Sequence, residues 1–132
     1  MTAADYHGAM SEARVRAIRG AVCLERDDAA EMRDAVCELL DAILSGNNLA
    51  REDIISVILT STPDLRSSFP AEGARAFGLT DVPLLCAQEI DVAGAMPRVI
   101  RVMLHGYSTR AVGQISHVYL RGAEALRQDL IT

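Results

Sequence analysis

The chain has 132 residues, half of them hydrophobic, which is enough to bury the core of one domain. Its 13 basic residues, all arginines, are outnumbered by 18 acidic ones, so the net charge is −5. This balance argues against nucleic acid or an anionic membrane surface as the main partner, because both favour a basic face.

The N-terminal segment predicts a tail followed by a strand. Residues 1–13 are small and polar, and we expect a disordered tail before a single domain that spans residues 14–132. Residues 15–24 alternate and carry branched side chains. They predict a strand with Ile18 on one face and Arg19 on the other.

Residues 28–45 predict the longest helix. Asp28, followed three residues later by Glu31, resembles a capping box, and Gly46 is placed to end the helix. Apolar side chains recur at helical spacing and form a single stripe. The stripe consists of Met32, Val36, Leu39, Leu40, Ile43 and Leu44.

The middle of the chain predicts two strands separated by a short helix. The apolar run 54–60 is rich in β-branched residues and predicts a buried strand. Pro70 suits the first turn of a helix that ends near Gly78. Residues 82–89 then predict a third strand.

Residues 98–105 and 116–121 predict the last two strands, the first of which would place Val99, Arg101 and Met103 on one face. The order strand–helix–strand–helix–strand–strand–strand indicates an α+β (mixed α/β) fold, in which helices pack on one face of a mixed β-sheet. Because the other face is left uncovered, we expect the chain to form an oligomer.

Motifs for metals, cofactors and secretion are missing from the sequence. Cys23, Cys37 and Cys86 are widely spaced and odd in number, which suits a reducing compartment better than disulfides or a zinc site. There is no phosphate-binding glycine loop and no serine nucleophile motif. No apolar run approaches the ~20 residues that span a bilayer. We therefore expect a cytoplasmic protein without a metal or a cofactor.

Four segments carry a resemblance when they are taken together and in order. They are RAIRGA (16–21), STPDLRSSFPAEGAR (61–75), CAQEIDVAGAMPRVIRVMLH (86–105) and HVYLRGAEALRQDL (117–130). They resemble the AroH class of monofunctional, Bacillus-type chorismate mutases. The resemblance implies a homotrimeric pseudo-α/β-barrel with active sites between subunits. It also implies cofactor-free rearrangement of chorismate to prephenate in the biosynthesis of Phe and Tyr.

The resemblance also implies roles for individual residues. Arg101 matches the arginine at the substrate's ether oxygen, and Arg19 matches the one that binds a carboxylate, helped by Tyr119. Glu89 matches the glutamate that holds the ring hydroxyl, with Cys86 beside it.

The remaining matches concern the walls of the cleft. Phe69 and Arg75 match residues that line it, and Leu126 and Arg127 match a C-terminal segment that folds over the site. Glu72 departs from the pattern, because that position is often Lys in the family. The substitution is expected to weaken the electropositive rim of the cleft.

The implied chemistry fits a sequence without a nucleophile or base motif. Chorismate is a dianion, and its rearrangement is one pericyclic step in which no proton has to move. An enzyme can hold the reactive conformer. It can also place a fixed cation, here Arg101, where negative charge grows on the ether oxygen.

Other interpretations stay open from the residues alone. Arg101 could simply form an internal salt bridge, for example with Glu89. Arg19 taken singly is as often a strand-edge charge as a functional group, and Glu89, Cys86, Tyr119 and Phe69 taken singly are more often structural. Two other functions are compatible with the scaffold. One is a non-catalytic trimer that binds a small carboxylate, and the other is an imine or enamine hydrolase with an arginine in an interface cleft.

Overall fold

The computed structural model describes residues 12–127, so residues 1–11 of the expected tail lie outside the described residues. The main elements are β1 (Arg14–Cys23), α1 (Ala29–Gly46), β2 (Ile54–Ser61), α2 (Pro70–Phe77), β3 (Leu84–Gln88), β4 (Val99–Ser108) and β5 (Val118–Leu120). Short 3₁₀ helices cover Arg51–Asp53, Val112–Gln114 and Ala123–Arg127. The predicted order of strands and helices is confirmed.

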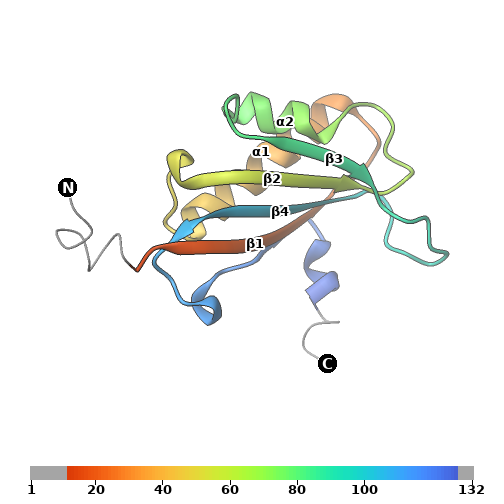
Figure 1. Ribbon diagram of the computed structural model, residues 1–132. Coiled ribbons are helices and arrows are strands. Elements are labelled where there is room, and N and C mark those ends of the chain that lie inside the picture. The colour runs from red at the N-terminus through yellow and green to blue at the C-terminus, as the bar shows by residue number, and fades with distance from the viewer. Residues whose placement is uncertain (1–11, 128–132) are drawn as a thin grey trace.

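The strands form one mixed sheet of five strands in the order β3-β2-β4-β1-β5. Figure 1 shows the first four of these side by side. The central strand β4 is antiparallel to both of its neighbours, β2 and β1. The outer strands β3 and β5 run parallel to β2 and β1. The predicted mixed sheet is therefore confirmed. The two longest strands, β1 and β4, pair along their whole length, so the side chains that they carry are held on a rigid backbone.

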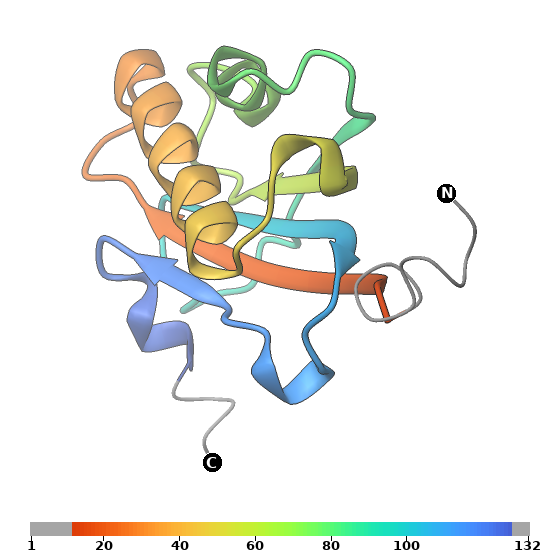
Figure 2. The same cartoon turned by 90° about the vertical axis from the view of Figure 1, so that its left-hand side faces the viewer.

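The helices α1 and α2 lie together on one face of the sheet (Figure 2). All six residues of the predicted stripe on α1 are buried, together with Ala35. Ile18 and Val22 of β1 and Leu104 of β4 meet them from the sheet side, all with no exposed surface. The core is aliphatic, as expected of a chain with few aromatic residues.

The ends of α1 differ in part from the prediction. The Asp28 side chain accepts the backbone N–H of Glu31, at 2.8 Å, but the Glu31 carboxylate accepts the N–H of Glu25 instead of closing a capping box. Gly46 is still helical, and the backbone N–H of Asn47 closes the last turn. The Asn47 side chain also bonds Ile43 and the chain at Ser116, so this helix end is fixed by tertiary contacts.

The second helix ends as predicted. Gly78 adopts a φ of 114°, a left-handed conformation that glycine adopts without strain, and caps α2. Among the described residues, no helix is long and apolar enough to cross a membrane.

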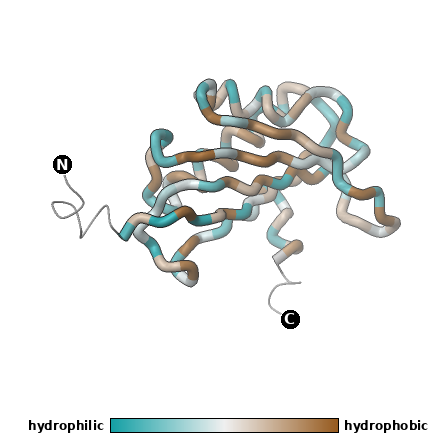
Figure 3. The backbone as a smooth tube through the Cα atoms, viewed as in Figure 1, coloured by the Kyte–Doolittle hydropathy of each residue, from teal (hydrophilic) through white to brown (hydrophobic). Residues whose placement is uncertain are grey.

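In the described part of the chain, the opposite face of the sheet carries no α-helix, and only the 3₁₀ helix Ala123–Arg127 packs against one end of it, at Ala21 and Val99. Along β4, Ile100, Val102 and Leu104 point to the helices, so the alternating residues Arg101 and Met103 point to the open face. Figure 3 shows the apolar stretches that run along these strands. Exposed apolar side chains on this sheet include Ile58 and Tyr107, which are 37% and 51% exposed.

Candidate active site

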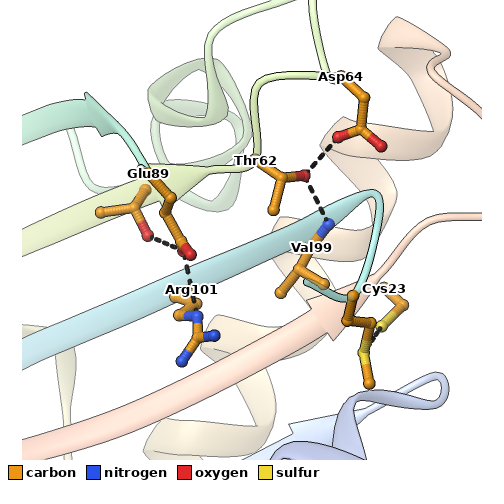
Figure 4. Close-up of polar contacts among 8 residues, drawn as sticks. Cys23, Thr62, Asp64, Glu89, Val99 and Arg101 are labelled. Carbon is orange, nitrogen blue, oxygen red and sulfur yellow. Dashed lines mark hydrogen bonds and ion pairs between the residues drawn. The ribbon is translucent and has the colours of Figure 1, made fainter. Parts of the chain in front are cut away.

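An acid–base pair with a hydroxyl lies on the open face where β2 meets β4. The Nε of Arg101 is 3.1 Å from Oε2 of Glu89, and the Thr60 hydroxyl donates to the same oxygen at 2.6 Å (Figure 4). The register sets this geometry, because Thr60 pairs directly with Arg101. Glu89 follows the end of β3 and is anchored by its backbone N–H to the carbonyl of Ser61. The internal salt bridge considered from the sequence is therefore present.

A hollow of about 250 Å³ next to Arg101 brings in two more of the expected residues, Arg19 and Tyr119. The register explains the space, because Ala21 of β1 pairs with Arg101 on one side and with Tyr119 on the other. The methyl group of Ala21 thus lies between the long side chains of Arg101 and Tyr119, which leaves a depression. Nδ1 of His117, just before β5, accepts the backbone N–H of Arg19 at 3.0 Å and so joins the start of β5 to β1.

Arg101 also borders a second hollow, of about 280 Å³, on the side of Glu89. The loop of residues 90–97 and the side chain of Asp64 complete its wall. Arg101 therefore stands between two depressions, with its carboxylate partner in one and a second arginine in the other. Within residues 12–127, no group of three or more His, Cys, Asp or Glu side chains is placed to hold a metal ion.

A hydrogen-bond clamp fixes the strand just before Arg101. The Thr62 hydroxyl donates to Asp64 at 2.5 Å and accepts the backbone N–H of Val99 at 3.0 Å (Figure 4). Asp64 in turn accepts the N–H of Arg98 at 2.9 Å, where the backbone takes a positive φ of 52°. The position of Arg101, two residues after Val99, is thus tied to the loop after β2.

The C-terminal 3₁₀ helix contacts the same region. Leu126 packs, with Tyr119, against a small buried cluster made of Ala21, Val99 and Ala123. The expected place of Leu126 at the site is therefore compatible with its packing. The side chain of Arg127 lies outside the described residues.

Phe69 and Cys86 line a separate hollow of about 380 Å³ at the β3 edge of the molecule. Cys86 pairs with Leu59, which is fully buried, so its side chain faces the helices, whereas Glu89 bonds Thr60 on the open face. The expectation that Cys86 lies beside Glu89 is wrong within one chain. The reason is the odd spacing of three residues along extended backbone, which puts the two side chains on opposite faces.

The other wall residues lie on α2 or just before it. Phe69 is 68% exposed, and Arg75 is exposed in the last turn of the helix. Glu72 accepts a hydrogen bond from the Ser68 hydroxyl at 2.9 Å. One chain thus gathers Arg19, Glu89, Arg101, Tyr119 and Leu126 in one region and presents the other wall residues elsewhere.

Thr60 is the member of this site that was not predicted from the sequence. A threonine in the apolar run 54–60 has the character of an ordinary strand residue, and Glu89 lies 29 positions away. Only the pairing of β2 with β3 and β4 brings the hydroxyl to the carboxylate.

The arrangement suits a small anion that also carries a hydroxyl group. Two guanidinium groups on one sheet face offer planar donors to carboxylates or to a developing oxyanion. A carboxylate beside them can accept a hydrogen bond from a hydroxyl.

Comparisons with known proteins agree with this chemistry. The family model described as chorismate mutase type I matches residues 15–130. Proteins named chorismate mutase AroH are 45% identical in Thermus thermophilus and 40% identical in Bacillus subtilis strain 168. Each matches over 117 residues, which is 88% of this chain and 96% and 92% of the relative. A solved chorismate mutase from Clostridium thermocellum superposes with a TM-score of 0.81 at 42% identity, covering 83% of this chain and 97% of that one.

Proposed function

The chain belongs to the chorismate mutase type I family and has that family's activity, and we propose that Arg101, Glu89 and Arg19 carry it. The reaction converts chorismate to prephenate, a step of aromatic amino acid biosynthesis. One C–O bond breaks while one C–C bond forms, and no proton is transferred. The chain's residues therefore have two tasks, which are to hold the compact substrate conformer and to stabilise the charge that shifts during the step.

We propose that Arg101 stabilises the negative charge that grows on the ether oxygen as the C–O bond breaks. Its Nε is occupied by Glu89, but the guanidinium is half exposed and borders both hollows. Its terminal nitrogens make no hydrogen bond to any residue in the range 12–127. A cation that is already oriented stabilises the transition state without reorganising, and such donors are typically worth about 3–4 kcal/mol.

The other residues bind the parts of chorismate that do not react. Arg19 and Tyr119 lie in the hollow beside Arg101 and bind a substrate carboxylate. Glu89 accepts the ring hydroxyl. Its negative charge also lies close to the ring, where positive character builds up in the transition state. No resident cofactor takes part in this proposal.

We propose that the chain forms a trimer in which each active site lies between two neighbouring subunits. The hollows of about 250 and 280 Å³ beside Arg101 are smaller than the ~300–1,000 Å³ typical of ligand pockets. The exposed Phe69 of a neighbouring subunit, together with its Cys86 and Arg75, would complete the wall. Leu126 and Arg127 would close the cleft. A ring of three copies also covers the open, partly apolar face of the sheet.

The location in the cell is a proposal of the same kind. The cysteines Cys23, Cys37 and Cys86 are all free, which favours a reducing compartment such as the cytoplasm. The non-catalytic binder considered from the sequence has no support among the similar proteins.

The observation that carries the assignment of roles is the Arg101–Glu89 pair on the open face, next to Arg19. The test follows the loss of chorismate's ultraviolet absorbance with the wild type, with Arg101→Ala and with Arg33→Ala. Arg33 is an exposed arginine on α1 and serves as the matched control. We expect Arg101→Ala to lower kcat by roughly 100- to 1,000-fold and the control to leave it unchanged. A folded Arg101→Ala protein with wild-type kcat would refute the role of Arg101.

A further inference from the structure

We propose that Thr60 is a positioning residue for the mutase step, acting through Glu89 on Arg101. This inference rests on the proposed roles of those two residues. Thr60 stands in β2 and is partly buried on the open face, in the hollow shared by Arg19 and Arg101.

The two groups that hold Glu89 meet at the same oxygen atom. Oε2 accepts the Thr60 hydroxyl at 2.6 Å and lies 3.1 Å from Nε of Arg101. Within the described part of the chain, Oε1 accepts no hydrogen bond. The carboxylate therefore keeps one oxygen for a substrate hydroxyl, while the other is fixed by two donors.

The hydroxyl can orient the carboxylate because it stands on rigid backbone. Thr60 pairs with Arg101 on one side and with Ala87 of β3 on the other, and a β-branched side chain has a restricted χ1. The side chain of Glu89 is less constrained, because Glu89 lies in the loop after β3. Its backbone is nevertheless held by the hydrogen bond from its N–H to the carbonyl oxygen of Ser61. A short hydrogen bond to a charged acceptor is strong enough to select one rotamer.

Fixing Glu89 also fixes Arg101. The side chain of Arg101 is 50% exposed, so packing alone leaves it several conformations. The contact with Oε2 engages Nε and directs the two terminal nitrogens away from Glu89. Thr60 thus sets the geometry of the cation and the anion together.

The test is a comparison of Thr60→Val with Thr60→Ser and with Ser56→Ala. Valine keeps the shape and removes the hydroxyl, while serine retains a hydroxyl. Ser56 is the matched control, because it lies on the same face of β2 as Thr60 but pairs with His105 instead of Arg101. Its Oγ is 3.5 Å from Nδ1 of His105. We expect Thr60→Val to lower kcat by about 10- to 100-fold with little change in KM, because the carboxylate contacts of Arg19 are left intact. Thr60→Ser should recover most of kcat, and Ser56→Ala should match the wild type.

A double-mutant cycle separates this role from a structural one. If Thr60 acts through Glu89, adding Thr60→Val to Glu89→Ala should cause no further loss of kcat. An equal loss in both backgrounds, or wild-type kcat for Thr60→Val, would overturn the inference. If Glu89→Ala itself kept wild-type kcat, the proposed role of Glu89 would fail instead. Thr60→Ala provides the same comparison if Thr60→Val does not fold.

Discussion

Arg101 and Glu89 lie 3.1 Å apart as an ion pair at a site that has to receive a dianion. The pair is not a buried structural bridge, because the two side chains are 50% and 21% exposed. Exposed pairs of this kind contribute little to stability, typically about 0–1 kcal/mol. We therefore infer that the pair serves to orient Arg101. Glu89 engages Nε, and the two terminal nitrogens of the guanidinium stay available to a ligand.

Glu89→Ala should separate catalysis from stability. We expect kcat to fall by about 100-fold, because the ring hydroxyl loses its acceptor and Arg101 loses its orientation. The free energy of unfolding should fall by no more than about 1–3 kcal/mol, because a partly exposed ion pair and one hydrogen bond from Thr60 are lost. Chorismate turnover and urea unfolding, measured on the same preparations, check both parts. A large loss of stability with normal kcat would mean that the pair serves the fold.

Mixing two inactive variants should restore activity if neighbouring subunits share each site. Arg101→Ala removes the cation from one surface, and Phe69→Asp places an anion on the other. Since Phe69 is 68% exposed, its replacement should not disturb the fold. Co-refolded in equal amounts, the two should form some interfaces in which both surfaces are intact. In a closed ring these make up about a quarter of the sites, so about a quarter of the wild-type rate is expected.

The double variant Arg101→Ala/Phe69→Asp, co-refolded with the wild type, is the control for this mixing. It is expected to give the same fraction of intact sites, because again one interface in about four joins two wild-type surfaces. If the single variants stayed inactive together while this control regained activity, each site would have to be built within one subunit.

Glu72→Lys should strengthen substrate capture. Glu72 lies in the first turn of α2, three residues after Phe69, so it is at the rim of the proposed cleft. Replacing an anion by a cation there attracts a dianionic substrate. We expect kcat/KM to rise by about two- to tenfold at low ionic strength and the gain to shrink as salt is added. Glu52→Lys makes the same charge change on an exposed residue just before β2, at the opposite end of that strand from Thr60, and should show no comparable gain.

The strands and the helix with regular apolar spacing could be predicted from the sequence, because the spacing of apolar residues follows the face of each element that is buried. The stripe on α1 and the alternation that sets Arg19 opposite Ile18 both follow from spacing along one element. The end of α1 was less predictable. Asn47 closes it through bonds to Ser116, 69 positions away, and no local pattern contains that contact.

The candidate site shows the same division between local and distant information. The sequence indicated the ion pair of Arg101 with Glu89 as one alternative. It did not indicate Thr60, because the role of Thr60 depends on the packing of three strands. Cys86 was assigned by resemblance to a place beside Glu89, although the spacing of three residues along a strand points to the opposite face.

Asp27 should make stability depend on pH in the acid range. Hydrogen bonds from the Ser67 side chain and from the backbone N–H groups of Arg66 and Ser67 hold the pKa of Asp27 below its ordinary value of 3.8. A carboxyl group with a lowered pKa stabilises the fold above its unfolded pKa, and this contribution disappears as the pH falls through the folded value. Asp27→Ala should therefore melt below the wild type at pH 7.

The difference in melting temperature between Asp27→Ala and the wild type should close as the pH is lowered below 3.8. Asp81→Ala is a suitable control, because Asp81 is exposed and accepts no hydrogen bond from any described residue. A difference that persisted unchanged at low pH would show that Asp27 stabilises the loop by a means other than its charge.

Gly73→Ala should destabilise the contact between the two helices. A Cβ added to Gly73 would lie 2.6 Å from Cβ of Val36 and 3.3 Å from the carbonyl oxygen of Arg33, so α2 would have to move away from α1. Overpacking of this kind typically costs about 1–3 kcal/mol, more than the ~1 kcal/mol that alanine gains over glycine in a helix.

Gly46→Ala is the matched control, since nothing lies within 4 Å of the added Cβ and the residue is still helical. In urea unfolding at one protein concentration, we expect Gly46→Ala to equal or exceed the wild type in stability and Gly73→Ala to fall below it. Equal stability of the two variants would mean that the close approach of α1 and α2 is not maintained in solution.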